Sequence, residues 1–97
     1  YLLQAVLIGA GLWGVENKTD PGKRLDIDMY AEGHKVKNAP KLPLNLLDAL
    51  RAFQNNKIMR GILGAEFADS YLKLKMEEWN SYMQHFSEWE RQNALDV

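Results

Sequence analysis

The segment from Glu16 to Tyr30, ENKTDPGKRLDIDMY, gathers residue types that could do chemistry. Its three acids, Asp20, Asp26 and Asp28, could act as general bases or bind Mg²⁺. Aspartates in a loop this polar are more often solvated or hydrogen-bonded to nearby backbone. We therefore assign no catalytic role to these three carboxylates on their spacing alone.

A glycine pattern precedes this segment. Gly9, Gly11 and Gly14 have the spacing G-x-G-x-x-G. In dinucleotide-binding folds this pattern lies between a strand and the N-terminus of a helix. Here the glycines fall at the end of an expected helix and no helix follows, so a phosphate-binding loop is disfavoured.

The two histidines do not form a recognisable metal site. A zinc site needs three or four converging ligands, usually at short spacings, whereas His34 and His85 are far apart and the chain has no cysteine. His34 falls in an expected loop, and His85 near the end of an expected helix is more typical of capping or packing. We predict no metal ligand in this segment.

An aromatic row near the end of the chain could in principle stack nucleic-acid bases. It comprises Trp79, Tyr82, Phe86 and Trp89. Nucleic-acid platforms place basic groups among such rings, but glutamates neighbour these, and the chain has a formal net charge of −1. Core packing or a subunit contact is the favoured interpretation, and no nucleic-acid partner is expected.

The helices that must position these groups can be predicted from periodicity. Tyr1 to Leu12 favours a helix that is apolar nearly all round, so it should be buried on several sides. It is too short and too interrupted by glycine to span a membrane. Asp20-Pro21-Gly22 is a turn signal, because Pro presets φ and Gly accepts positive φ. Pro40 and Pro43 break any regular element in the stretch that follows.

Further helices are expected after this loop. The first should begin with Asn45 as its N-cap and end at Asn55-Asn56. The others should cover Lys57 to Leu63 with Gly64 as a stop, about Ala65 to Phe86, and Glu88 to about Leu95 behind a Ser87–Glu90 capping box. One face of the longest helix should carry Ala68, Leu72, Trp79, Tyr82, Met83 and Phe86, with Lys75 at its edge.

The sequence thus predicts a mainly α chain with one long irregular loop. We divide it into a buried helix over residues 1–14, a loop over 15–44 and helices over 45–97. The 97 residues suffice for one small domain, and burial at that size is marginal. The opening without Met, directly in an apolar run, leads us to expect a piece of a longer polypeptide.

The order of motifs resembles the C-terminal part of the glutamine synthetase catalytic domain, an α+β domain. GLWGVENKTDPGKRLDIDMY is similar to the family segment G-L-x-G-I-x-N-K-x-x-P-G-x-x-x-D-x-x-x-Y. The positions that match are Gly11, Leu12, Gly14, Asn17, Lys18, Pro21, Gly22, Asp26 and Tyr30. The runs KLPLNLLDALRAFQNN, GAEFADSYLKLKMEEWNSY and FSEWERQNALDV resemble the family's later motifs, in the same order.

The resemblance implies an enzyme that condenses glutamate with ammonium, using ATP and Mg²⁺ or Mn²⁺, through γ-glutamyl phosphate. It also implies a cytoplasmic homo-oligomer, a dodecamer-like ring with active sites between subunits. The family's catalytic, ATP-binding and metal-binding residues lie upstream of this segment, so none is assigned here. Tyr30 matches the tyrosine that is adenylylated in some bacterial members, which makes it a candidate regulatory position.

Two departures from the family pattern leave alternatives open. Trp13 replaces the usual Asp of G-L-D-G, and the tail looks closest to the subgroup that includes γ-glutamylmethylamide synthetases. A glutamate–amine ligase is therefore the alternative to a glutamate–ammonia ligase. A binding protein rather than an enzyme is the other alternative: a free-standing helical interaction module could use the aromatic row to dock a partner.

Overall fold

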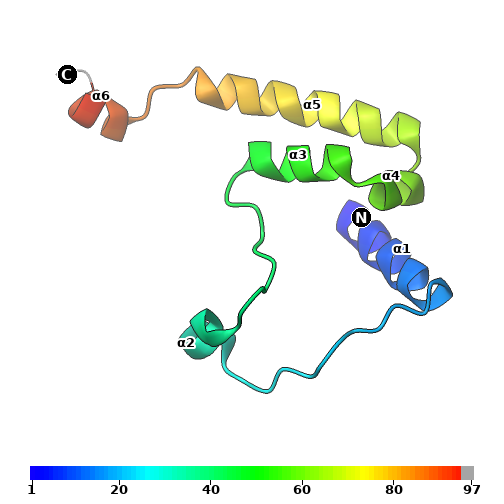
Figure 1. Ribbon diagram of the computed structural model, residues 1–97. Coiled ribbons are helices and arrows are strands. Elements are labelled where there is room, and N and C mark those ends of the chain that lie inside the picture. Colours follow the sequence, from blue (N-terminus) through cyan, green and yellow to red (C-terminus); the bar gives the residue numbers. More distant parts are fainter. Residues whose placement is uncertain (95–97) are drawn as a thin grey trace. The chain divides into compact units, whose positions relative to one another are not determined.

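A computed structural model of the chain describes residues 1–94. These residues form helices and connecting segments, with no strand among them, which confirms the mainly α prediction (Figure 1). The chain divides into two parts, Tyr1–Leu42 and Pro43–Val97, and each is described by itself. The elements are α1 (Leu2–Glu16), α2 (Met29–Glu32), η1 (Gly33–Lys35), α3 (Leu46–Asn55), α4 (Lys57–Leu63), α5 (Ala65–Met83) and α6 (Glu88–Ala94).

The first helix, α1, is longer than predicted because its glycines do not end it. Between Leu2 and Val15 there is no charged side chain, so the helix has no polar face. No residue of α1 is buried, and Leu7 and Val15 are 63% and 76% exposed. The expected burial of this helix is thus not found within the described residues. None of the helices in the described residues is long and apolar enough to cross a membrane.

The expected long loop contains two helical turns that the sequence did not reveal. α2 and the 3₁₀ helix η1 interrupt it between Met29 and Lys35. The carboxylate of Asp28 explains the start, because it accepts hydrogen bonds from the backbone N–H groups of Tyr30 (2.9 Å) and Ala31 (3.4 Å). The prediction of irregular structure through residues 15–44 was wrong for these seven residues. The turn at Gly22 is as expected, with φ +81°.

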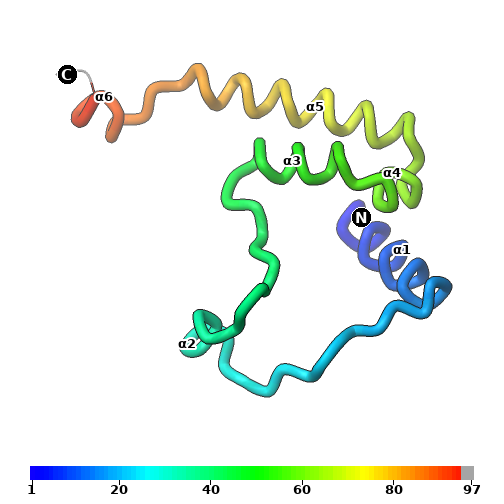
Figure 2. Tube along the Cα trace, in the orientation of Figure 1, coloured from blue at the N-terminus to red at the C-terminus, as the bar shows by residue number. Residues whose placement is uncertain are grey.

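The second part is built from α3, α4 and α5, which pack on one another (Figure 2). Leu50 on α3 and Ala68 on α5 are its buried hydrophobic residues, at 3% and 0% exposure. The rings of Phe53 on α3 and Tyr71 on α5 meet edge to face, with centroids 6.1 Å apart. The contact between α3 and α5 therefore forms a small core.

The predicted signals at the helix ends in this part are confirmed. Asn45 caps α3 by accepting from the backbone N–H of Asp48 at 2.9 Å, and Gly64 separates α4 from α5 with φ +86°. Ser87 and Glu90 form the expected capping box: the N–H of Ser87 donates to Glu90 Oε2 at 2.8 Å, and the N–H of Glu90 donates to Ser87 Oγ at 3.2 Å. Leu95, the expected end of the last helix, lies outside the described residues.

The long helix differs from its prediction at the C-terminal end. α5 stops at Met83 rather than Phe86, and Tyr82, Met83 and Phe86 are 60–66% exposed instead of packed. Helix length gives the reason: the 19 residues of α5 span about 28 Å and the ten of α3 about 15 Å. α3 is thus long enough to cover about half of the apolar stripe on α5.

Candidate functional site

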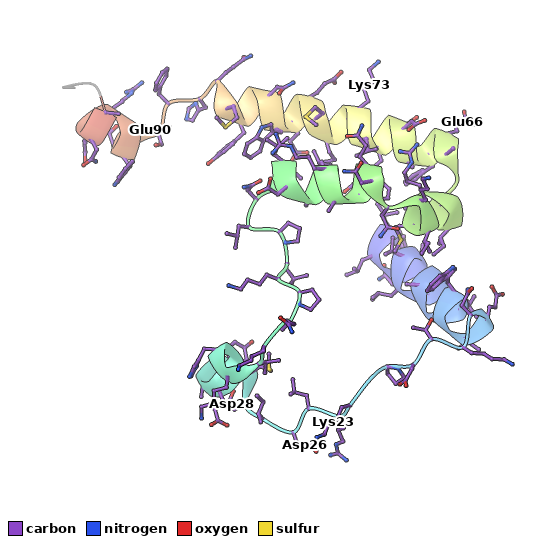
Figure 3. All side chains as sticks on the ribbon, in the orientation of Figure 1. Lys23, Asp26, Asp28, Glu66, Lys73 and Glu90 are labelled. Atoms are coloured by element: carbon purple, nitrogen blue, oxygen red, sulfur yellow. The ribbon has the colours of Figure 1, made fainter. Side chains whose placement is uncertain are left out.

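The three aspartates of the 16–30 segment are all used in local contacts. The N–H of Gly22 donates to Asp20 Oδ1 at 2.8 Å, and Arg24 Nε donates to Asp26 Oδ1 at 2.6 Å. Asp28 caps α2 through the bonds given above. Figure 3 labels Asp26 and Asp28 along this segment. Each carboxylate therefore stabilises a turn or pairs with a near neighbour, as expected of aspartates in a polar loop.

Tyr30 is placed on the first turn of α2 and is the most accessible functional candidate. Its relative exposure is 103%, so the side chain makes no packing contact that shields it. Its backbone N–H is held by Asp28, and the next turn is supported by an ion pair between Lys35 and Glu32. A capped turn thus presents the Tyr30 phenol to solvent.

The glycine pattern does not form a phosphate-binding loop. Gly9, Gly11 and Gly14 all lie inside α1, so they are not at the junction between a strand and a helix that dinucleotide binding requires. Their backbone N–H groups belong to a continuing helix and cannot cradle a phosphate. The sequence-based rejection of this site agrees with the geometry.

The two histidines lie in different parts of the chain. His34, in η1, lines a hollow of about 540 Å³ together with Met29, Val36 and Lys41, among others. His85 follows α5 and lines a smaller hollow of about 130 Å³ with Ser87 and other residues. Within residues 1–94, no group of three or more His, Cys, Asp or Glu side chains is arranged to hold a metal ion.

The aromatic row is only partly a packing element. Trp79 and Tyr82 have ring centroids 5.7 Å apart at an angle of 42°, and Trp79 is half-buried. Phe86 and Trp89 are exposed at 65% and 69%. Core packing thus accounts for Trp79, whereas the later rings remain available for a contact outside the described residues.

Among residues 1–94, two exposed contacts in the second part shift a pKa. The backbone N–H and then the hydroxyl of Ser87 hold the pKa of Glu90 below its usual range. The hydrogen bond from Lys75 to Glu78, 2.5 Å, together with the charge of that carboxylate, raises the pKa of Lys75. Each contact favours the charged form of its residue, and neither moves the pKa of that residue toward neutral pH.

One feature of the second part was not found from the sequence. Arg60 on α4 donates from Nη2 to Asp69 Oδ1 on α5 at 2.7 Å, across nine residues. The sequence contains no spacing signal for this pair, because the turn at Gly64 sets the angle between the two helices. The pair borders a cavity among α3, α4 and α5.

Comparison with known proteins places the chain in a family. The model of the family "Glutamine synthetase, catalytic domain" matches residues 1–94. The chain is 60% identical over 97 residues to a glutamine synthetase of Rhizobium leguminosarum bv. phaseoli, covering all of this chain and 22% of that protein. It is 38% identical over 104 residues to a glutamate–methylamine ligase of Methyloversatilis universalis, covering 99% of this chain and 22% of that protein.

A solved structure shares the fold. The structure described as apo GmaS without ligand superposes with a TM-score of 0.92 at 50% identity, covering all of this chain and 23% of that one. The chain thus spans about a quarter or less of the length of these relatives. The resemblance noted in the motifs is confirmed: the chain belongs to the glutamine synthetase family, as part of its catalytic domain.

Proposed function

We propose that the full-length protein is an ATP-dependent ligase that joins ammonium to the γ-carboxylate of glutamate through γ-glutamyl phosphate. The observation that carries this proposal is the 60% identity to Rhizobium glutamine synthetases along the whole chain. ATP and Mg²⁺ or Mn²⁺ would be bound by residues outside this segment. The segment itself would support the catalytic domain and would be inactive alone.

The structural contribution of α1 follows from its composition. A helix without a polar face is stable in water only when other apolar groups cover it. We propose that α1 lies in the interior of the larger catalytic domain, which restores the burial expected from its sequence. Gly11 and Gly14 have open space where a Cβ would project, so a neighbouring backbone can approach them closely.

Assembly and location belong to the same proposal. A ring-shaped homo-oligomer, dodecamer-like, is supported by the exposed rings of Tyr82, Phe86 and Trp89, which an interface would cover. The cytoplasm is the expected compartment for an enzyme of nitrogen metabolism that consumes glutamate and ATP.

A glutamate–amine ligase is the second candidate. The 38% identity to a glutamate–methylamine ligase and the fold shared with GmaS at 50% identity favour it. Trp13, where the family usually has Asp, is a further departure from the glutamine synthetase pattern. A free-standing interaction module is less well supported, because α1 presents apolar surface on all sides.

A substrate panel decides between the two ligases. Phosphate release by the full-length enzyme would be measured with glutamate, ATP and each of ammonium, methylamine, ethylamine and a polyamine. We expect the largest kcat/KM with ammonium. A larger kcat/KM with methylamine would replace the first candidate by the second, and no release with any amine would overturn both.

We also propose that Tyr30 is a regulatory position modified by an adenylyl group. Its support is full exposure on a turn that Asp28 caps. Mass spectrometry of the Tyr30 peptide, from cells grown with excess and with limiting nitrogen, should show the added adenylyl group in one condition. A Tyr30→Phe variant is the control, and an unmodified peptide in both conditions would remove this proposal.

A further inference from the structure

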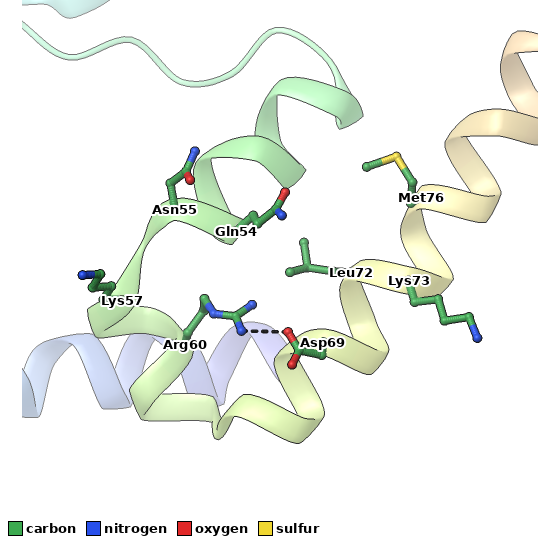
Figure 4. A pocket seen from close by; sticks show the side chains of 8 residues that line it. All are labelled: Gln54, Asn55, Lys57, Arg60, Asp69, Leu72, Lys73 and Met76. Atoms are coloured by element: carbon green, nitrogen blue, oxygen red, sulfur yellow. Dashed lines mark hydrogen bonds and ion pairs between the residues drawn. The ribbon is translucent and has the colours of Figure 1, made fainter.

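A cavity among α3, α4 and α5 has the features of a ligand site. Its volume is about 630 Å³, and it lies wholly within the second part of the chain (Figure 4). Its polar lining residues are Gln54, Asn55, Lys57, Arg60, Asp69 and Lys73. Leu72 and Met76 form its apolar wall.

The charge of this lining is opposite to that of the chain. Lys57, Arg60 and Lys73 supply three positive charges and Asp69 one negative charge, which leaves an excess of two positive charges. The chain as a whole has a formal net charge of −1. Positive charge concentrated in a cleft with low-dielectric walls attracts anions more strongly than the net charge suggests.

The side chain of Arg60 is held in one orientation at the cavity by a bond to Asp69. The Arg60 side chain is 24% exposed, and its Nη2 donates to Asp69 Oδ1 at 2.7 Å, which orients the guanidinium between α4 and α5. A guanidinium carries five N–H donors, so this bond occupies only part of it. Gln54 also lines the cavity, and its side-chain amide adds donors.

The two lysines extend outward from opposite sides of Arg60 in Figure 4, one from α4 and one from α5. Their four-carbon stems allow the ammonium groups of Lys57 and Lys73 to turn toward a bound anion. Asp69 limits the ligand to the side of the guanidinium away from its carboxylate, because like charges repel.

We propose that this cavity binds a small oxyanion, a phosphate or a short carboxylate, with Arg60 as its oriented anchor and Lys57 and Lys73 as mobile counter-charges. A planar guanidinium matches the oxygen pairs of both kinds of anion. The residues that line the cavity include no Ser, Thr, Cys or His, so the proposal is for binding alone. The proposal does not depend on which amine the enzyme uses.

The test compares two double variants of the full-length protein with equal charge change. Lys57→Gln/Lys73→Gln alters the cavity, and Lys23→Gln/Lys37→Gln removes two exposed lysines from the first part of the chain. Inorganic phosphate and succinate are titrated separately by calorimetry at low and high salt. Anion bound elsewhere contributes equally in both variants, so their difference reports this cavity.

We expect phosphate or succinate to bind about fivefold more weakly to Lys57→Gln/Lys73→Gln than to the control, with the difference reduced at high salt. Whichever anion shows the larger difference identifies the chemical class. Arg60→Gln should weaken binding further, but it also removes the contact with Asp69, so the lysine variants carry the test. Equal affinity of the two double variants for both anions would overturn the proposal.

Discussion

The two parts of the chain hold their structure in different ways. From Pro43 onward, contacts join separate helices: Arg60 with Asp69 across nine residues, and Phe53 with Tyr71. Before that point, the side-chain hydrogen bonds of the described residues reach no further than four residues, as in the bonds of Asp20 and Asp28. The second part has a small core, whereas the first has capped turns and an uncovered helix.

This difference separates what each part of the chain can stabilise by its own contacts. The second part can fix the arrangement of α3, α4 and α5 by its own contacts. The side-chain hydrogen bonds of the described residues in the first part fix only local turns, so the burial proposed for α1 would depend on other parts of the catalytic domain. Within residues 1–94, the side-chain hydrogen bonds to the turn that carries Tyr30 come from Asp28. Local order of that kind suits a residue that another protein must reach.

The largest expected effect is in the core of the second part. Leu50→Ala removes a side chain that is 3% exposed and should lower the free energy of unfolding by about 2–5 kcal/mol. Leu25→Ala, at a site that is 52% exposed, is the control and should change it by less than about 0.5 kcal/mol. Urea unfolding of the full-length protein measures both. Equal losses would mean that the two parts do not differ as described.

A smaller effect separates the two N-caps. Asn45→Ala removes a cap from a helix that packs in the core, and should lower the free energy of unfolding by about 1 kcal/mol. Asp28→Ala removes the same type of cap from a four-residue turn, and should leave the unfolding midpoint unchanged. Its effect should appear as faster hydrogen exchange at the amides of Tyr30 and Ala31. A shift of the midpoint by Asp28→Ala would show that this turn is coupled to the core.

The sequence predicted most of the second part because its signals are local and strong. Asn45 before an apolar periodic run, Gly64 between two helices and the Ser87–Glu90 box each specify a helix end by one side chain. The same reasoning missed α2, whose four residues are too few to show a period. It also placed the end of α5 three residues too late, because periodicity continued where packing did not.

The site could be predicted only in part. Turn chemistry predicted that the aspartates make local contacts, and Asp20 and Asp28 do accept hydrogen bonds from nearby backbone N–H groups. The cavity beside Arg60 could not be predicted, because it depends on the angle between α4 and α5. An angle between helices arises from packing, which no single-residue signal specifies.

The contact between Arg60 and Asp69 should contribute less than a cap. Arg60 is 24% and Asp69 is 66% exposed at the side chain, so solvent screens the pair and its coupling should be about 0.2–1 kcal/mol. A double-mutant cycle with Arg60→Gln and Asp69→Asn isolates that term from the other effects of each substitution. A coupling near zero would mean that apolar contacts alone join α4 to α5.

The smallest expected effect is a pH dependence at the capping box of α6. The backbone N–H and hydroxyl of Ser87 lower the pKa of Glu90, with a lesser contribution from His85, so the folded state favours the ionised carboxylate. The stabilisation is therefore complete above the ordinary pKa of a glutamate, about 4.3, and is lost as pH falls through the lowered pKa. NMR titration of Glu90 in Ser87→Ala should show its pKa moving partway back, because the backbone N–H still donates. An unchanged pKa would show that the Ser87 hydroxyl contributes nothing to it. The lowered pKa of Glu90 would then depend on a backbone N–H donor, the kind of donor that Asp28 accepts from at the start of α2.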